Sequence, residues 1–150
     1  MADTTIDDPE KYFQVKAYDG TGSSLAVTLD GDTDLQPNLV WIKQRGGSGT
    51  SHTLFDSVRG VQEAIFSNGT NAETTRTDAV SAFNSDGFSV GSNGDLNANT
   101  ETYVAWNWKE DSTAGFDIVT FTGNQTARTI SHSLGAKPQW MWIKNREKVG

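Results

Sequence analysis

The polar segment SNGDLNANTE (residues 92–101) contains the side chains whose types and spacing are best suited to binding chemistry. Asp95, Asn97 and Asn99 occupy alternate positions in it. Carboxylate and amide oxygens at such spacing can hold calcium, although the segment lacks the repeated carboxylates and the closing glutamate of a strong calcium loop. We therefore take these three residues as candidate glycan-binding residues and expect no cofactor, calcium being the one ion to consider. A solvated loop is the alternative interpretation.

Asp56 and Arg59 form a second polar pair, three residues apart in the motif DSVRG (56–60). An acid and a guanidinium at this spacing could bind an anion or a metal. They could also form a structural bridge, in which the arginine ties loops together through a carboxylate and backbone carbonyls. We expect the structural bridge, because this is the usual role of a semi-buried arginine in a β-rich protein, and we predict no metal ligands.

Residues for catalysis are poorly arranged in this chain. Glycan-cleaving enzymes need two carboxylates about 5 to 10 Å apart in one cleft, whereas the acids here cluster in predicted turns. His52 and His132 are far apart, and the chain contains no nucleophile elbow, P-loop or dinucleotide-binding glycine pattern. We therefore expect a protein that is not an enzyme. Both histidines should form loop hydrogen bonds, and His52 is added to the candidate glycan-binding residues.

Trp41, Trp106, Trp108 and Trp142 lie in segments of alternating polarity. In TYVAWNWK (102–109) the pattern predicts that Trp106 and Trp108 share the inward face of a strand. Large aromatic rings supply much of the buried area of a protein core, so we expect structural roles for Trp41, Trp106 and Trp108. The alternative is a stacking platform for sugar rings, whose apolar C–H groups suit an aromatic face.

The composition narrows the function classes further. The 150 residues include 19 acidic and 12 basic side chains, which give a net charge of −7 and a pI near 4.6. Because this charge repels phosphate backbones, we expect no nucleic-acid partner. No apolar run in the sequence approaches membrane-spanning length, so we expect no membrane insertion. The absence of cysteine excludes disulfides and thiol catalysis.

The elements that must position these residues are predicted to be β-strands. Segments such as FQVKAY (13–18) and SLAVTL (24–29) alternate with a period of two, the pattern of a half-buried strand. Runs of Gly, Asn, Asp and Ser separate them and favour turns. DSVRGVQEAIF (56–66) has helical spacing, but Gly60 favours a turn followed by a strand over 63–67. We predict about ten antiparallel strands in an all-β sandwich, with no substantial helix.

An internal repeat divides the chain. PNLVWIKQR (37–45) returns as PQWMWIKNR (138–146), and YFQVKAYDGTG (12–22) aligns with GFDIVTFTGNQ (115–125), so that Phe13 corresponds to Phe116. The predicted organisation is an N-terminal arm at 1–11, a sandwich at 12–110, a linker at 111–114, and the opening strands of a second copy at 115–150. The arm is either a frayed acidic leader or an attachment segment.

The second copy is too short to close a core of its own, because three strands leave an apolar face exposed. We expect the chain to be a piece of a longer tandem protein. An ordered fragment would lie against the first unit or against a neighbouring subunit, and truncation is the remaining alternative.

Five short motifs in order give the chain a family resemblance. They are WIKQR (41–45), DSVRG (56–60), SNGTNAE (67–73), SDGFSVG (85–91) and YVAWNWK (103–109). Together they resemble an uncharacterised family of bacteriophage tail-fibre and virion surface proteins with a concanavalin A-like (lectin- or glucanase-type) β-sandwich. The likeness covers residues 7–109 and restarts at Ala114. It implies a jelly-roll fold but no defined ligand.

The resemblance implies a structural protein of the virion, made in the host cytoplasm. We expect a tail-fibre or receptor-binding protein whose lectin-like domain engages host-surface glycans. The alternatives are a capsid decoration or tail adaptor module that contacts virion proteins alone, and a polysaccharide depolymerase. The expected partners are other virion proteins, a host cell-surface glycan or receptor, and further copies of the chain, as a trimer if it forms a fibre.

Overall fold

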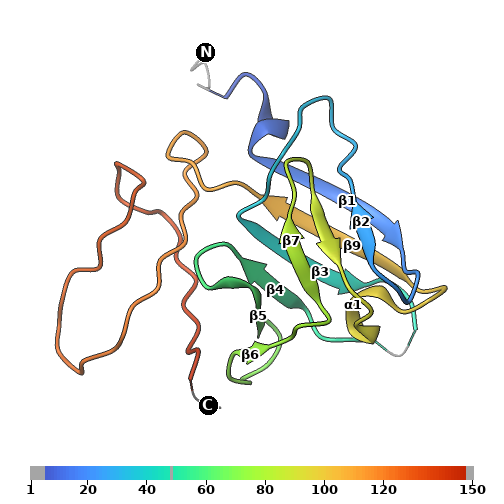
Figure 1. Ribbon diagram of the computed structural model, residues 1–150. Helices are drawn as coiled ribbons and strands as arrows, with labels where there is room; N and C mark the ends of the chain where they lie inside the picture. Colours follow the sequence, from blue (N-terminus) through green and yellow to red (C-terminus); the bar gives the residue numbers. More distant parts are fainter. Residues whose placement is uncertain (1–5, 48, 148–150) are drawn as a thin grey trace.

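The computed structural model describes residues 6–47 and 49–147, and within these ranges the chain forms nine β-strands and two short helices (Figure 1). In chain order the elements are η1 (Pro9–Lys11), β1 (Phe13–Asp19), β2 (Leu25–Val27), β3 (Leu39–Gln44), β4 (Thr53–Asp56), β5 (Gly60–Phe66), β6 (Thr74–Thr75), β7 (Val80–Phe83), β8 (Phe88–Val90), α1 (Gly94–Asn97) and β9 (Thr102–Trp108). The prediction of an all-β protein is confirmed.

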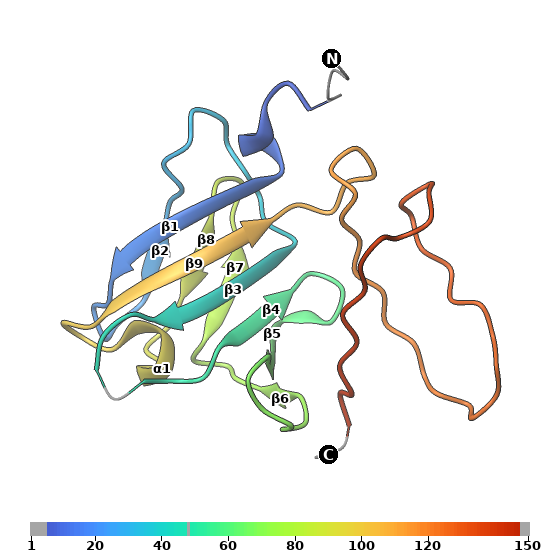
Figure 2. The same ribbon diagram turned by 180° about the vertical axis from the view of Figure 1, so that it is seen from behind.

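The strands form two antiparallel sheets that pack face to face. The large sheet has the order β1-β9-β3-β4-β5-β6, and the small sheet has the order β2-β8-β7. The small sheet lies in front in Figure 1 and the large sheet in front in Figure 2. Between them, Ile42 and Phe55 of the large sheet share one buried core with Val27, Phe88 and Val90 of the small sheet. This is the predicted antiparallel β-sandwich.

The alternation in β9 is opposite to the predicted one. Tyr103, Ala105 and Asn107 point into the core and are buried, whereas Trp106 and Trp108 lie on the other face and are partly exposed. The predicted inward packing of the two tryptophans is therefore wrong.

Hydrogen bonds explain how polar side chains of β9 enter the core. The Tyr103 hydroxyl accepts from the backbone N–H of Ala98 at 2.9 Å, and the Asn107 amide donates to the carbonyl of Gln14 at 3.2 Å. Because a buried polar group is tolerated when it has a partner, these side chains can occupy the inward positions and leave the tryptophans on the outside.

The motif DSVRG forms the turn between β4 and β5. The Asp56 carboxylate accepts hydrogen bonds from the backbone N–H groups of Val58 and Arg59 at 3.1 and 2.8 Å. Gly60 follows with φ +119°, a value that glycine adopts without strain. The turn therefore ends one strand and starts the next, and β5 contains most of the strand predicted after it.

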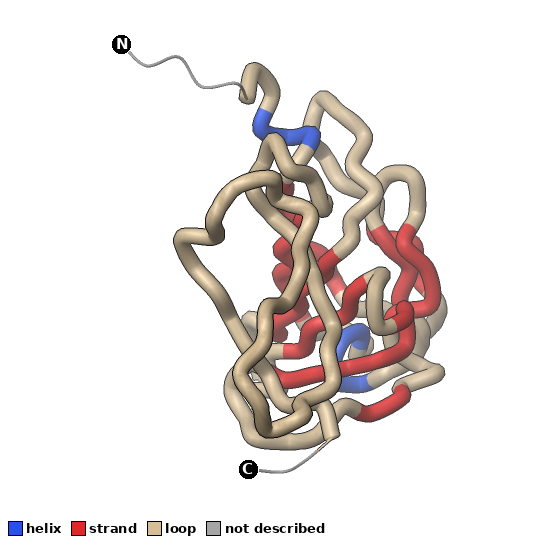
Figure 3. Tube along the Cα trace, turned by 90° about the vertical axis from the view of Figure 1, so that its left-hand side faces the viewer, coloured by secondary structure: helices blue, strands red, loops and turns tan. Residues whose placement is uncertain are grey.

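Residues 115–147, which we call the tail, contain no β-strand, so the predicted opening strands of a second copy are not formed there. An isolated bridge joins Asp111 to Phe116, and the chain then makes a wide loop and returns beside β4 and β5 (Figures 1 and 3). The physical reason is that a strand needs a neighbour to satisfy its backbone groups, and the tail has no sheet to join.

Parts of the predicted termini lie outside the described residues, namely 1–5 of the N-terminal arm and 148–150 of the repeat. Within the arm, η1 is capped by the Asp8 side chain, which accepts from the N–H of Glu10 at 3.1 Å. Among the described residues no helix is long and apolar enough to cross a membrane.

Candidate functional site on the outer face of the large sheet

The face of the large sheet that points away from the core carries two rows of apolar side chains, which we call the outer face. The first row crosses β1, β9 and β3 as Phe13, Trp108 and Leu39. The second row crosses β1, β9, β3, β4 and β5 as Val15, Trp106, Trp41, Leu54 and Ile65. An antiparallel sheet with one face in the core commonly turns a polar face to water. A second apolar face therefore indicates that something else covers it.

Aromatic rings pack side by side on the outer face. The ring centroid of Trp41 lies 5.5 Å from that of Trp106 and 6.3 Å from that of Trp108, while Phe13 lies 4.9 Å from Trp108. Pairs at these separations stabilise a protein beyond the area that they bury. At the β1 end, Phe13 and Val15 are 39% and 45% exposed. The three tryptophans thus pack on the surface of the sheet rather than in the core, and the β1 end of the surface is open.

The tail covers the other end of the outer face. Trp142 packs against Trp41 with ring centroids 5.6 Å apart, and Phe116 stacks on Trp108 at 6.3 Å. Leu54 points away from the core yet is buried, in the region where the returning tail lies beside β4 (Figure 2). The tail therefore acts as a partial third layer on the sandwich.

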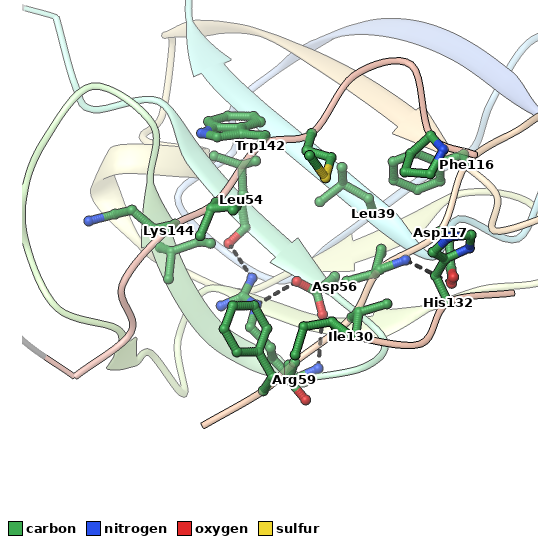
Figure 4. Close-up of a pocket in the computed structure, with 18 of the residues that line it drawn as sticks. Leu39, Leu54, Asp56, Arg59, Phe116, Asp117, Ile130, His132, Trp142 and Lys144 are labelled. Carbon is green, nitrogen blue, oxygen red and sulfur yellow. Dashed lines mark hydrogen bonds and ion pairs between the residues drawn. The ribbon is translucent and has the colours of Figure 1, made fainter. Parts of the chain in front are cut away.

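A cavity of about 420 Å³ lies between the tail and the sheet (Figure 4). Leu39 and Leu54 line it from the sheet, and Phe116 and Trp142 line it from the tail. Its lining is mostly apolar, so the space suits an apolar or aromatic group rather than a charged one.

Arg59 joins the sheet to the tail through a chain of ion pairs. Its side chain is only 3% exposed; Nε donates to the Asp56 carboxylate, and Nη1 donates to Glu73 Oε2 at 2.8 Å. Two further N–H groups donate to backbone carbonyls at 2.9 and 3.3 Å. The structure thus arranges Asp56 and Arg59 as a structural bridge, with four of the five guanidinium N–H groups in use.

Glu73 extends this bridge to the end of the tail. Its two carboxylate oxygens accept from the Arg146 guanidinium at 2.9 and 2.7 Å, and its backbone N–H donates to the Arg146 carbonyl at 2.7 Å. Burial raises the pKa of Glu73, but hydrogen bonds from Arg146 and Arg59 outweigh the burial and hold this pKa below its ordinary value. Glu73 is therefore an anion that holds two arginines, one in the turn between β4 and β5 and one in the tail.

Neither Glu73 nor Arg146 is among the site residues predicted from the sequence. Each ends a recognisable motif: Glu73 closes SNGTNAE, and Arg146 closes the second copy of the repeated segment. No local spacing connects two residues so far apart in the chain. The available signal was the expectation of a buried Arg59, which requires more than one acidic partner to be well satisfied.

His52 forms a hydrogen bond with Trp41 of the outer face. Trp41 Nε1 donates to His52 Nδ1 at 3.0 Å, and the two rings meet edge to face with centroids 5.6 Å apart. Burial lowers the pKa of His52, and the positive charge of Lys43 lowers it further. Because only a neutral imidazole nitrogen can accept this bond, His52 in its neutral form orients Trp41.

The structure does not bring Asp95, Asn97 and Asn99 together. Asp95 and Asn97 lie in α1, where positions two apart point in different directions, and Asp95 is paired with Arg76 at 2.8 Å. Asn97 is fully buried: its amide donates to two backbone carbonyls at 2.6 and 2.7 Å and accepts from a backbone N–H at 2.8 Å. Asn97 is thus saturated within the chain and not free to bind a glycan, which corrects its predicted role. Asn99 is exposed.

Residues 6–47 and 49–147 contain no group of three His, Cys, Asp or Glu side chains that could hold a metal ion.

A protein family described as a domain of unknown function (DUF7483) matches residues 8–150. The chain belongs to this family. The matched range includes the tail as well as the sandwich, so the segment that covers the outer face is part of the family sequence. No curated protein and no solved structure matches the chain.

Proposed function

We propose that the chain is a non-enzymatic structural protein of a bacteriophage virion, of the tail-fibre type, and that the outer face of its large sheet is a protein-binding surface. One observation carries the proposal: the outer face is apolar across five strands, and the tail covers only part of it. Contiguous apolar surface of this kind marks interaction sites in soluble proteins. The five motifs that resemble phage virion surface proteins support the proposed location in a virion.

The chemistry of the outer face favours a protein over a glycan as its partner. Sugar recognition combines an aromatic ring with several hydrogen-bonding groups around it, and the two rows contain no such groups besides the indole N–H groups. The Trp41 N–H is already used by His52. Asp95 and Asn97, the predicted glycan ligands, are engaged elsewhere. The surface resembles the apolar centre of a protein–protein interface more closely than a lectin site.

The ion pairs support a role without catalysis. Asp56 and Asp117 are the acids that line the cavity under the tail. Asp56 is paired with Arg59, and Asp117 accepts hydrogen bonds from the backbone N–H groups of Ile118 and Ser133. These carboxylates are thus engaged within the chain, whereas a general acid in glycan cleavage needs free access to its substrate.

The test is the presence of the chain in particles. Virions of the phage that encodes it, purified and washed in high salt, should yield its peptides by mass spectrometry at a fixed ratio to the major structural proteins. Antibody raised against the sandwich and labelled with gold should mark the tail. If the chain is made during infection but is absent from washed particles, the proposal fails.

A second candidate function, binding of a host-surface glycan, is favoured by the open β1 end of the outer face. Phe13 is half-exposed there, next to Trp108, and could stack with a sugar ring. On a glycan array, Phe13→Ala should abolish a wild-type signal, whereas Trp140→Ala in the tail should leave it unchanged. Absence of any wild-type signal on host-derived glycans would refute this candidate and leave the protein-binding role standing.

A further inference from the structure

We infer that the outer face recognises a second copy of itself, so that two chains pack outer face to outer face about a two-fold axis. The tail provides the observation. Its sequence repeats β1 and β3, and the two aromatic rings with which it contacts the outer face, those of Phe116 and Trp142, are repeats of outer-face residues. The inference goes beyond the proposed function, because it names the partner as another copy of this chain.

Two contacts establish the correspondence. Trp142 is the repeat of Trp41, and these two rings pack together at 5.6 Å. Phe116 is the repeat of Phe13, and both phenyl rings contact Trp108, at 6.3 and 4.9 Å. Positions that point outward in one copy of the sequence therefore meet positions that point outward in the other copy.

In a two-fold interface, too, outward-facing positions of one copy meet outward-facing positions of the other copy. The same patch serves both partners, and a residue near the axis meets its own equivalent. The contact between Trp41 and Trp142 is an intramolecular version of such a pairing.

Residues 115–147 leave part of the outer face uncovered. They repeat the sequences of β1 and β3, whereas Trp106 and Trp108 of the outer face come from β9. The β1 end remains exposed at Phe13 and Val15. The outer face of a second chain would bring both β1 and β9 and would extend the surface that the tail has begun to cover.

The tail itself has apolar side chains left over. Trp140, Met141 and Ile143 are 78%, 70% and 70% exposed, and they lie next to the ring that packs on Trp41. Exposure of this size is unfavourable for an isolated chain. A second copy that approaches the outer face would also cover these side chains.

The charge distribution permits the approach. A net charge of −7 opposes self-association in general. The residues that form the two rows are uncharged. Asp56, which continues the first row on β4, is paired with Arg59, and Lys43 lies in the row beyond Trp41. The contact surface is thus depleted in charge at its centre, as in homodimer interfaces.

The first test measures mass against concentration for the whole chain. Sedimentation equilibrium should show the 16.3 kDa monomer converting to a species of twice that mass as concentration rises. Val15→Lys places a charge on the open end of the outer face and should weaken dimerisation at least about tenfold. Ala26→Lys, on an exposed strand position of the small sheet, is the matched control and should leave the dimer unchanged.

The second test does not depend on weakening the dimer. The chain has no cysteine, so single cysteines report one position each. Ala17 and Ala26 are both exposed alanines in strands, one on the outer-face side of β1 and the other in the small sheet. A long bismaleimide should join Ala17→Cys chains into covalent dimers and leave Ala26→Cys chains single.

Three results would overturn the inference: a mass that stays at the monomer value throughout, a closed trimer, or equal cross-linking of the two cysteine variants. Each of these leaves the test for presence in the virion untouched, so failure of the dimer and failure of the proposed function can be told apart.

Discussion

Replacement of Glu73 by Gln removes the carboxylate that joins Arg59, in the turn between β4 and β5, to Arg146 of the tail. Gln keeps the size of the side chain and one carbonyl acceptor, but it carries no charge. Arg59 remains a cation with a side chain that is 3% exposed. It therefore loses one of its two carboxylate partners at a place that water hardly reaches.

The loss of unfolding free energy can be derived from the partners that Arg59 keeps. A hydrogen bond to a charged group contributes about 1.5–3 kcal/mol to stability. Because Asp56 and two backbone carbonyls still hold Arg59, the loss of the Glu73 contact should cost about 2 kcal/mol. The Arg146 side chain is 40% exposed, so its contact with Glu73 adds less than about 1 kcal/mol. The free energy of unfolding should fall by about 2–3 kcal/mol in all.

Urea unfolding, followed by tryptophan fluorescence, measures this change. The matched variant is Arg146→Gln, which removes only the tail half of the bridge and should lower the free energy of unfolding by less than about 1 kcal/mol. If Glu73→Gln costs no more than Arg146→Gln, the buried contact with Arg59 contributes nothing and the reasoning is refuted.

The pH dependence of the same pair of curves gives an independent check. The pKa of Glu73 is lowered in the folded chain, so its contribution to stability is complete above the ordinary glutamate value of 4.5. The contribution is lost as the pH falls through the folded pKa, because the unfolded chain then binds the proton more readily. The unfolding free energies of wild type and Glu73→Gln should therefore converge well below pH 4.5.

Asn97→Ala should lower the free energy of unfolding by about 2–4 kcal/mol, because it leaves buried backbone groups without partners; Asn99→Ala, an exposed control, should change it by less than about 0.5 kcal/mol. Since the folded chain has a lowered His52 pKa, wild-type stability should decrease as the pH falls below 6.5. His52→Phe should lose that slope in thermal melts. In deuterium exchange, backbone amides of residues 138–146 should exchange much faster than those of residues 37–45, although the two sequences are nearly the same; equal protection would show that the tail is a paired strand in solution.

The strands and the two-layer packing could be predicted from the sequence because a period of two is a local property. FQVKAY and LVWIKQ alternate within six residues, and the Gly- and Asn-rich segments between such runs form turns for reasons internal to those residues. The turn at DSVRG was likewise predictable, since Asp56 caps it and Gly60 follows it.

The orientation of β9 could not be predicted in the same way. Alternation separates two faces of a strand but does not say which one is buried. In most antiparallel sheets polarity decides the question, whereas in β9 both faces contain apolar side chains. Tyr103 and Ala105 point inward and Trp106 points outward, an assignment that depends on the hydrogen-bond partners and space offered by other strands.

The candidate site on the outer face could not be predicted from the sequence for a related reason. The predicted ligands were polar atoms of one loop, and in the structure Asp95 and Asn97 form their interactions within the chain. The surface that is open is apolar and is assembled from five strands whose order along the sheet differs from their order in the chain. The spacing of residues along the chain predicts neither that strand order nor the ion pair between Glu73 and Arg146, which lie far apart in the sequence.

The repeated segment shows how far neighbours decide the form of a strand. In β3, Val40 and Ile42 are fully buried against the small sheet, and the backbone is paired on both sides by β9 and β4. Their repeats in the tail, Met141 and Ile143, have no sheet beneath them and are 70% exposed, and no strand forms. Strand preference depends on such packing more than on the residues themselves.

The tail does keep one contact made by an outward-facing position of the repeated segment: Trp142, the repeat of Trp41, packs against Trp41. Trp142 therefore packs on the sheet although Met141 and Ile143, on the other side of the same segment, have no sheet to pack against. Because this attachment needs no paired backbone in the approaching segment, a folded second chain could make it too. That chain would bring the same side chains already fixed on a sheet, and so would lose less conformational entropy on binding than the tail does.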